Sequence, residues 1–123
     1  MRYELTQRFY FEAAHSLNRQ IDAESSRRVH GHTSPARVTL GGAPDPRTGM
    51  LVDLALLRRA LERVRDTLDH RLLDEVAGLG APTLENLCAF LWRSLEHEFD
   101  SLLRIEVSRE ASGDSCCLVR TAA

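Results

Sequence analysis

The sequence predicts an α+β fold, in which two helices cover one face of an antiparallel sheet. Apolar and polar residues alternate near both ends of the chain, as they do in half-buried strands. Two central stretches instead carry apolar residues at helical spacing. The 123 residues suffice for one domain, so we expect a single domain over residues 1–123 with the element order ββααββ.

The first two strands are expected on either side of a polar loop. Residues 2–13 alternate, and residues 30–42 alternate again after the aperiodic segment 16–29. The apolar residues that share one side are Tyr3, Leu5, Phe9 and Phe11 in the first strand and Ala36, Val38 and Leu40 in the second. Because proline cannot donate to a strand ladder, Pro35 indicates that the second strand starts at an edge or a bulge.

Two helices are expected in the middle of the chain. Asp53 and Thr83 are suitable N-caps for them, and Gly78 and Gly80 interrupt the segment between them. Their apolar stripes are Leu54, Leu57, Leu61, Val64 and Leu68 in the first helix and Leu84, Leu87, Leu91, Leu95 and Phe99 in the second.

The last two strands are expected to form a hairpin. Leu103, Ile105 and Val107 alternate with polar residues, and residues 115–120 form the final strand. The turn between the two strands is predicted at residues 112–114, which are Ser-Gly-Asp.

The composition excludes several classes of function. All 16 basic residues are arginine, which excludes Schiff-base chemistry on lysine and lysine-containing phosphate loops. A net charge of −2 gives no indication of nucleic-acid binding, and no apolar run approaches the ~20 residues of a membrane helix. Cys88, Cys116 and Cys117 are expected to be reduced thiols in a cytoplasmic protein.

Three histidines form a candidate metal site. His30 and His32 flank Gly31, and residues i and i+2 of an extended segment point to the same side. His15 ends the first strand, and strand pairing can bring it beside the other two. Three imidazoles with an open fourth position are the ligand set of a catalytic zinc. The alternative is a turn with solvated imidazoles.

A second candidate group, Asp69 and His70, lies where the first helix is expected to end. A carboxylate near a histidine can orient its ring and stabilise the imidazolium. Adjacent residues do not face each other on a helix, which leaves open that the two act on different partners. The alternative is a protonated histidine favoured by the helix dipole. His97, between two glutamates, is expected to be an exposed surface residue.

Six segments together match a known pattern. They are FYFEAAHSL, HGH, GMLVDLALLRRAL, LDHRLLDE, PTLENL and the strand that ends in VSRE, and they span nearly the whole chain. In this order they resemble the family of 6-pyruvoyl tetrahydropterin synthases and 6-carboxytetrahydropterin synthases. The resemblance implies a T-fold, in which subunits join through their strands into a barrel. It also implies a homo-oligomer, usually a hexamer of two stacked trimers, with active sites between subunits.

The resemblance implies roles for the candidate residues. His15, His30 and His32 take the places of ligands to Zn²⁺, and Asp69 and His70 those of a catalytic pair. The implied substrate is 7,8-dihydroneopterin triphosphate, with Arg27 and Arg28 either near its triphosphate or in a solvated loop. The implied function is that of a 6-carboxy-5,6,7,8-tetrahydropterin synthase. Alternatives are a 6-pyruvoyl synthase, a variant side-chain-cleaving enzyme, a pterin- or purine-binding homologue and an unrelated metal-binding module.

The resemblance also implies a residue that anchors the pterin ring. Glu110 best matches the carboxylate that accepts two parallel hydrogen bonds from the pterin ring. In strict alternation, however, Arg109 shares the side of Ile105 and Val107, and a bulge is needed to bring Glu110 there. Glu106 is a less favoured anchor, and exposed strand charge is the alternative for both glutamates.

The chain departs from the family pattern at one catalytic position. Members generally carry a cysteine four residues before the first histidine of HxH, where this chain has Ser26. A thiol has a pKa near ~8.5 and is easily tuned, whereas a hydroxyl needs an activating base. We therefore expect one of three outcomes. Ser26 acts slowly with His70, a carboxylate of the same loop (Glu24 or Asp22) takes its place, or the chain has lost this reaction and retains only zinc and pterin binding.

Overall fold

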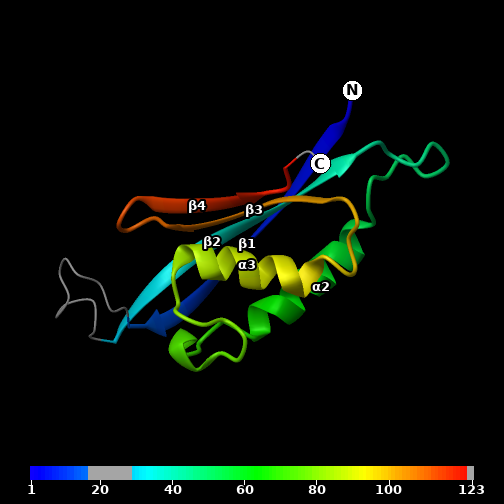
Figure 1. Ribbon diagram of the computed structural model, residues 1–123. Coiled ribbons are helices and arrows are strands. Elements are labelled where there is room, and N and C mark those ends of the chain that lie inside the picture. Colours follow the sequence, from blue (N-terminus) through cyan, green and yellow to red (C-terminus); the bar gives the residue numbers. More distant parts are fainter. Residues whose placement is uncertain (17–28, 122–123) are drawn as a thin grey trace.

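The structure is a computed structural model that describes residues 1–16 and 29–121 (Figure 1). The elements are β1 (Tyr3–His15), β2 (His30–Gly42), α2 (Leu54–Asp66), the short 3-10 helix η1 (Leu73–Glu75), α3 (Leu84–Leu95), β3 (Leu102–Arg109) and β4 (Asp114–Val119). The predicted order ββααββ and the α+β class are confirmed. The short helix η1, between the two main helices, was not predicted.

The four strands form one antiparallel sheet in the order β1-β2-β3-β4. β1 and β2 pair along their full 13 residues, from Tyr3 opposite Gly42 to His15 opposite His30. β2 pairs with β3 only from Ala36 onward. The end of the sheet that carries the histidines is therefore a two-stranded extension of β1 and β2 beyond β3.

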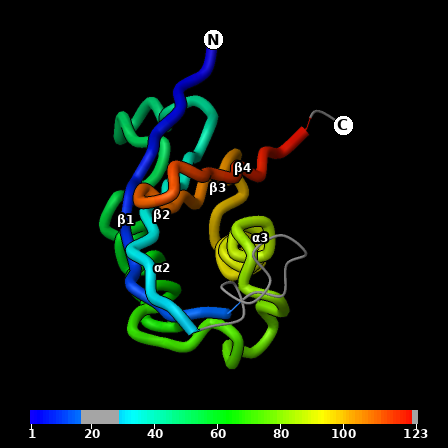
Figure 2. The backbone as a smooth tube through the Cα atoms, turned by 90° about the vertical axis from the view of Figure 1, so that its left-hand side faces the viewer, coloured from blue at the N-terminus to red at the C-terminus, as the bar shows by residue number. Residues whose placement is uncertain are grey.

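Both helices lie on the same face of the sheet (Figures 1 and 2). α3 packs against β3 and β4, and α2 packs against β1. The predicted caps are present: Asp53 accepts a hydrogen bond from the N–H of Ala55 at 2.9 Å, and Thr83 accepts one from Asn86 at 3.1 Å. These bonds satisfy N–H groups that the start of a helix leaves without intrahelical partners.

The hydrophobic core lies between the sheet and the helices. Its largest fully buried apolar side chains are Phe11, Val38, Leu40, Leu57, Leu68, Leu73, Leu87, Leu91, Leu95, Leu102 and Ile105. Burial of each contributes about 1.5–3 kcal/mol relative to exposure. Most of them belong to the apolar positions predicted from strand alternation and from helical spacing. These two patterns together therefore predict which faces of the strands and helices form the core. Among the described residues, no helix is long and apolar enough to cross a membrane.

The helices are shorter than their apolar stripes predict. α2 ends at Asp66 and α3 at Leu95, although Leu68 and Phe99 are buried as expected. Both side chains reach the core from the turns that follow the helices. An apolar residue that is buried in the turn after a helix falls at the same sequence spacing as a further buried residue of the helix. The apolar stripe alone therefore overestimates the length of the helix.

The strands differ from the prediction in detail. Pro35 lies inside β2, one residue before pairing with β3 begins at Ala36, so β2 is flanked only by β1 at this proline. The register shift of the sheet lies between Thr39 and Leu40. β4 begins at Asp114, which was expected to be part of the turn.

Candidate functional site

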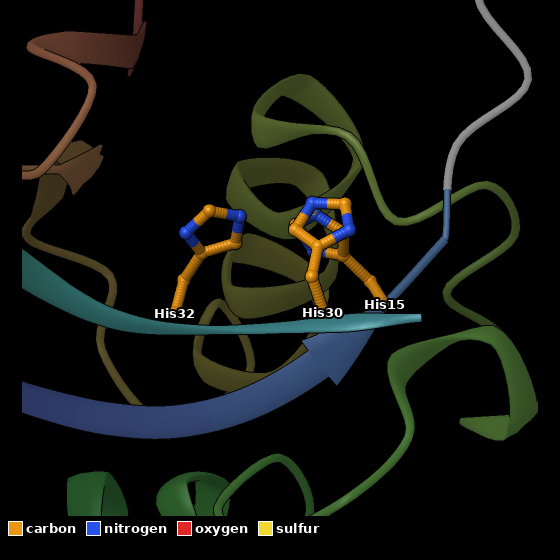
Figure 3. Close-up of side chains that lie close together, drawn as sticks. All are labelled: His15, His30 and His32. Atoms are coloured by element: carbon orange, nitrogen blue, oxygen red, sulfur yellow. Dashed lines mark hydrogen bonds between the residues drawn. The ribbon is translucent and has the colours of Figure 1, made fainter. Parts of the chain in front are cut away.

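The register of β1 and β2 brings three histidines together at the two-stranded extension (Figure 3). His15 lies opposite His30, and His32 lies two residues further along β2, so alternation directs the three rings to one face. The Nε2 atoms of His15 and His30 are 3.1 Å apart. The ring centroids lie 4.6, 4.7 and 4.8 Å from one another. The rings thus converge as the sequence predicts.

The surroundings favour the neutral form of His15 and His32. His15 is 2 % exposed, and burial, followed by the guanidinium of Arg109 and the other two histidines, lowers its pKa to about 4. Burial and the same guanidinium lower the pKa of His32. A neutral imidazole offers the lone pair that a metal ion requires, so proton competition is weak near neutral pH.

This donor set fits a divalent transition-metal ion. One nitrogen from each ring lies within 4.8 Å of the other two, a separation that one ion can bridge with bonds of about 2.0–2.1 Å after small ring movements. Three protein ligands leave coordination positions for oxygen atoms of a substrate. Imidazole nitrogens suit several ions, so the geometry defines the site without fixing the metal.

Asp69 and His70 form a hydrogen-bonded pair in the turn after α2. Nδ1 of His70 lies 2.8 Å from Oδ2 of Asp69, and the guanidinium of Arg65 lies 3.2 Å from the same oxygen. The restriction on neighbouring residues of a helix does not apply, because the helix has already ended. His70 instead has a left-handed backbone, with φ of 57°, and its ring contacts the preceding carboxylate.

Backbone groups of β1 hold this turn. The N–H of Glu12 donates to Oδ1 of Asp69 at 2.8 Å, and the N–H of His70 donates to the carbonyl of Glu12 at 2.6 Å. The bond from Glu12 is the main cause that lowers the pKa of Asp69. Asp69 is therefore ionised at neutral pH and favours the proton on Nδ1 of His70, which leaves Nε2 as the accepting atom.

Within one chain, the Asp69–His70 pair lies at the outer edge of β1, where backbone groups of Glu12 and Ala14 hydrogen bond with residues 69–71. The side chain of His70 is 76 % exposed and lines a pocket of about 560 Å³ with Glu12, Gly31 and Thr33. These three residues alternate with the histidines along β1 and β2, and therefore belong to the face without helices. His32, between Gly31 and Thr33 in the chain, also borders this pocket.

The end of β3 places Arg109, and not Glu110, on the helix-covered face. β3 and β4 pair without a register shift from Arg104 to Arg109, so the bulge that would bring Glu110 to this face is absent from the hairpin. Arg109 is 9 % exposed. Glu110 is exposed and lines a separate pocket of about 500 Å³ with Tyr10 and Arg65.

The structure describes some of the other candidate residues and not others. Those that lie outside the described residues are Asp22, Glu24, Ser26, Arg27 and Arg28. His97 is exposed, as predicted, and lies 3.9 Å from Glu96. Glu106 lies 4.0 Å from Arg37, both on the sheet face without helices. The three cysteines are free thiols, as expected.

Two polar contacts near the site were not predicted. Ser16 donates to Asp74 through its backbone N–H at 3.0 Å and its hydroxyl at 2.7 Å, which ties the end of β1 to η1. The contact of Arg65 with Asp69 could have been found, because opposite charges at i and i+4 pair on a helix. Asp74 lies in the short helix η1, where no charge spacing predicts its contact with Ser16.

Comparison with known proteins identifies the family. Residues 4–121 match the model of the family described as 6-pyruvoyl tetrahydropterin synthase. This chain belongs to that family. A putative 6-pyruvoyl tetrahydrobiopterin synthase of Caenorhabditis elegans is 35% identical over 99 residues, which cover 70% of this chain and 71% of that protein. A 6-carboxy-5,6,7,8-tetrahydropterin synthase of Synechocystis is 36% identical over 93 residues, with coverage of 72% and 70%.

Solved structures share the T-fold. The 6-pyruvoyl tetrahydropterin synthase of Caenorhabditis elegans superimposes with a TM-score of 0.84 at 23% identity, covering 98% of this chain and 97% of that one. A Plasmodium vivax synthase gives 0.74 at 17% identity, covering 99% of each chain. Another structure of that Plasmodium enzyme, with a TM-score of 0.73, is described as a catalytic-residue mutant in which cysteine replaces glutamate. The chain is thus a pterin lyase of the tetrahydropterin synthase family.

Loss of one imidazole tests the metal site. We expect His32→Ala to abolish stoichiometric binding of a divalent metal, because two imidazoles are too few ligands for a stable site. Wild-type protein should retain about one ion per chain after metal loading and desalting, measured by elemental analysis. His97→Ala, which removes an exposed histidine elsewhere, is the matched control and should retain the ion. Full metal content in His32→Ala would contradict the assignment.

The charge of Asp69 should appear in the pH dependence of stability. Its pKa is lowered from 3.8 in the folded chain, so it stabilises the fold above the unfolded pKa and loses this effect as pH falls through the folded pKa. We expect Asp69→Asn to lower the free energy of unfolding in urea at about pH 6, and the difference from wild type to shrink below about pH 4. Asp66→Asn, at the exposed end of α2, is the control. A difference that does not change with pH would contradict this role.

Proposed function

We propose that this chain is a zinc-dependent lyase that converts 7,8-dihydroneopterin triphosphate to 6-carboxy-5,6,7,8-tetrahydropterin. The observation that supports it most directly is the convergence of His15, His30 and His32 in a chain of the tetrahydropterin synthase family. Zinc bound there would supply a Lewis acid for the hydroxyl groups of the substrate side chain. The Synechocystis relative, named for the 6-carboxy product, favours this branch.

Asp69 and His70 are the proposed proton-transfer pair. Nε2 of His70 accepts a proton from the substrate side chain, while Asp69 orients the ring and stabilises the imidazolium that forms. Arg65 and the N–H of Glu12 keep Asp69 in position and ionised. In the proposed reaction triphosphate leaves and the side chain rearranges to a dicarbonyl. Water then adds to the carbonyl carbon next to the ring, the bond between the two carbonyl carbons breaks, and the ring carboxylate and acetaldehyde form.

The site is proposed to form between subunits, because the His70 ring borders a pocket lined mainly by residues of the sheet face without helices, whereas the three histidine rings lie on the helix-covered face. Among the described residues, only the segment 69–72 contacts the outer edge of β1, at Glu12 and Ala14, and no strand pairs with the outer edge of β4. Both edge strands expose apolar side chains: Tyr3 and Tyr10 are 66% and 59% exposed, and Val119 is 44% exposed. Pairing β4 of one copy with β1 of the next covers both edges and closes a barrel. We propose a hexamer of two such trimeric rings.

Glu110 and Ser26 complete the proposed site. Glu110 is the proposed anchor of the pterin ring, from the pocket that it shares with Tyr10. Ser26 stands where the family generally has a cysteine, and Glu24 or Asp22 is the proposed substitute if serine does not act. The Plasmodium vivax synthase, with a catalytic glutamate in its description, supports a carboxylate as the alternative to a thiol.

Two other functions are candidates. The Caenorhabditis elegans relative is named for the 6-pyruvoyl product, and its identity of 35% is nearly that of the Synechocystis protein. Ser26 favours the other candidate, a catalytically weakened pterin-binding homologue. In either case the free thiols suit a reducing compartment, and we place the protein in the cytoplasm.

Product analysis tests the function. Zinc-loaded protein incubated with 7,8-dihydroneopterin triphosphate should release 6-carboxy-5,6,7,8-tetrahydropterin and acetaldehyde, identified by mass. Ser26→Cys should raise turnover by about tenfold or more, because a thiol is the more easily tuned group, whereas Ser112→Cys in an exposed turn should not. A 6-pyruvoyl product would favour the second function, and pterin binding without turnover the third. Neither binding nor turnover would contradict all three.

Mixed oligomers test the shared site. His32→Ala and His70→Ala should each be inactive alone, because one lacks a metal ligand and the other the proposed base. Co-expression should restore about a quarter of the wild-type activity, since random mixing pairs an intact metal site with an intact His70 from a neighbour at that frequency. Two His32→Ala forms with different affinity tags are the control and should remain inactive. Failure of complementation in proven mixed oligomers would contradict a shared site.

A further inference from the structure

Arg8 lies beside a second arginine on the face of the sheet without helices. It is a half-buried residue of β1 and lies directly opposite Arg37 of β2. Residues that oppose each other on antiparallel strands point to the same face, with Cβ atoms about 4.5–5.5 Å apart. Arg37 in turn lies opposite Glu106 of β3, at a distance of 4.0 Å. This row across three strands therefore contains two guanidiniums and one carboxylate.

The opposition of Arg8 and Arg37 lowers stability, because like charges directly opposite each other on neighbouring strands repel. Among the residues that the structure describes, none forms an ion pair with Arg8 that would offset this repulsion. Proteins depart from such local rules mainly at functional sites. An anion bound at Arg8 would remove the repulsion.

Arg8 also lines the pocket of about 500 Å³ that contains Glu110, and Arg65 lines it too. Nε of Arg65 donates to the carbonyl of Tyr10 at 2.8 Å, and its Nη2 lies 3.2 Å from Oδ2 of Asp69. A guanidinium has five N–H donors, so these two contacts fix the position of Arg65 and engage only part of its donors. The pocket thus presents a fixed guanidinium and a second one on β1.

The charges of the pocket select the chemistry of a ligand. Its two guanidiniums outweigh the single carboxylate of Glu110, so the pocket attracts a negatively charged group. A guanidinium presents a planar fork that binds phosphate oxygens through two parallel N–H bonds. Glu110 can only accept hydrogen bonds when it is ionised, and therefore suits the N–H donors of the same ligand. The lining fits a molecule that combines N–H donors with a phosphate group.

We propose that Arg8, together with Arg65, binds a phosphate group of the ligand in this pocket. Thr33 lines both this pocket and the one that contains His70, so the two pockets adjoin. A phosphate held at Arg8 therefore lies in the pocket next to the proposed base. Applied to 7,8-dihydroneopterin triphosphate, this inference rests on the proposed function and assigns the triphosphate to the two arginines.

Tripolyphosphate is the first probe, because it tests the phosphate site without a pterin. We expect wild-type protein to bind it in calorimetric titrations at low salt, and Arg8→Gln to bind it at least about tenfold more weakly. Arg8→Lys, which keeps the charge but loses the planar fork, should lie between them. Arg47→Gln removes the same charge from a 90 % exposed side chain between β2 and α2, and should bind tripolyphosphate like wild type.

Tripolyphosphate also binds divalent metals, so the titration is repeated with His32→Ala, which lacks one ligand of the candidate metal site. Loss of binding in His32→Ala would overturn the inference, because a metal ion would then hold the phosphate. Absence of binding in wild type, equal affinity in Arg8→Gln, or equal weakening in Arg47→Gln would overturn it as well.

Folding of the variants is checked by circular dichroism and urea unfolding. Because Arg8→Gln removes a repulsion, we expect it to be at least as stable as wild type without phosphate. Arg8→Lys keeps the test available if Arg8→Gln does not fold.

Pterins with and without phosphate separate this inference from the proposed function. In a His70→Ala background, which prevents turnover, the protein should bind 7,8-dihydroneopterin triphosphate more tightly than 7,8-dihydroneopterin. Arg8→Gln should lose most of that preference, with little change for the unphosphorylated pterin. An unchanged preference would overturn the inference while the proposed function stands. Arg8-dependent binding of tripolyphosphate by a protein that binds neither pterin would support the phosphate site and contradict the proposed function.

Discussion

The pairing of β1 with β2 is the constraint on which the candidate site depends. An unbroken register places His15 directly opposite His30, and the two-residue period of β2 adds His32 on the same face. A shift of this register by one residue would move the histidines of one strand to the opposite face from those of the other. The geometry of the candidate metal site therefore depends first on how β1 and β2 pair, and only then on the individual side chains.

The core fixes that register. Phe11 on β1 and Ala36 and Val38 on β2 are fully buried against the helices, so a slipped strand would expose them and bury their polar neighbours. The histidines continue the same alternating pattern, past the point where β3 stops pairing. The apolar half of the sheet thus sets the position of the polar half, and the two-stranded extension opens the site to a ligand.

Local periodicity predicted the parts of this structure that depend on local geometry. It identified the four strands, both helix caps and the convergence of His30 with His32. It left open whether Asp69 and His70 contact each other, because their contact requires a left-handed residue held by the backbone of Glu12, more than fifty residues away in sequence. Alternation favoured Arg109 over Glu110 at the end of β3, whereas the family pattern favoured Glu110. β3 is regular up to Arg109, so alternation correctly predicted that Arg109 lies on the same face as Ile105 and Val107.

The distribution of the polar groups explains why one subunit is insufficient for the proposed chemistry. His15 and His32, whose pKa values are lowered, and the buried Arg109 lie on the helix-covered face, while Asp69 and its histidine lie at the outer edge of β1. The turn after α2 holds the carboxylate of Asp69 in hydrogen bonds to Glu12 and His70 and leaves the His70 ring exposed. In the proposed hexamer, the strand edges that need covering are also those that bring neighbouring copies together. In that proposal, assembly and completion of the active site follow from one structural requirement.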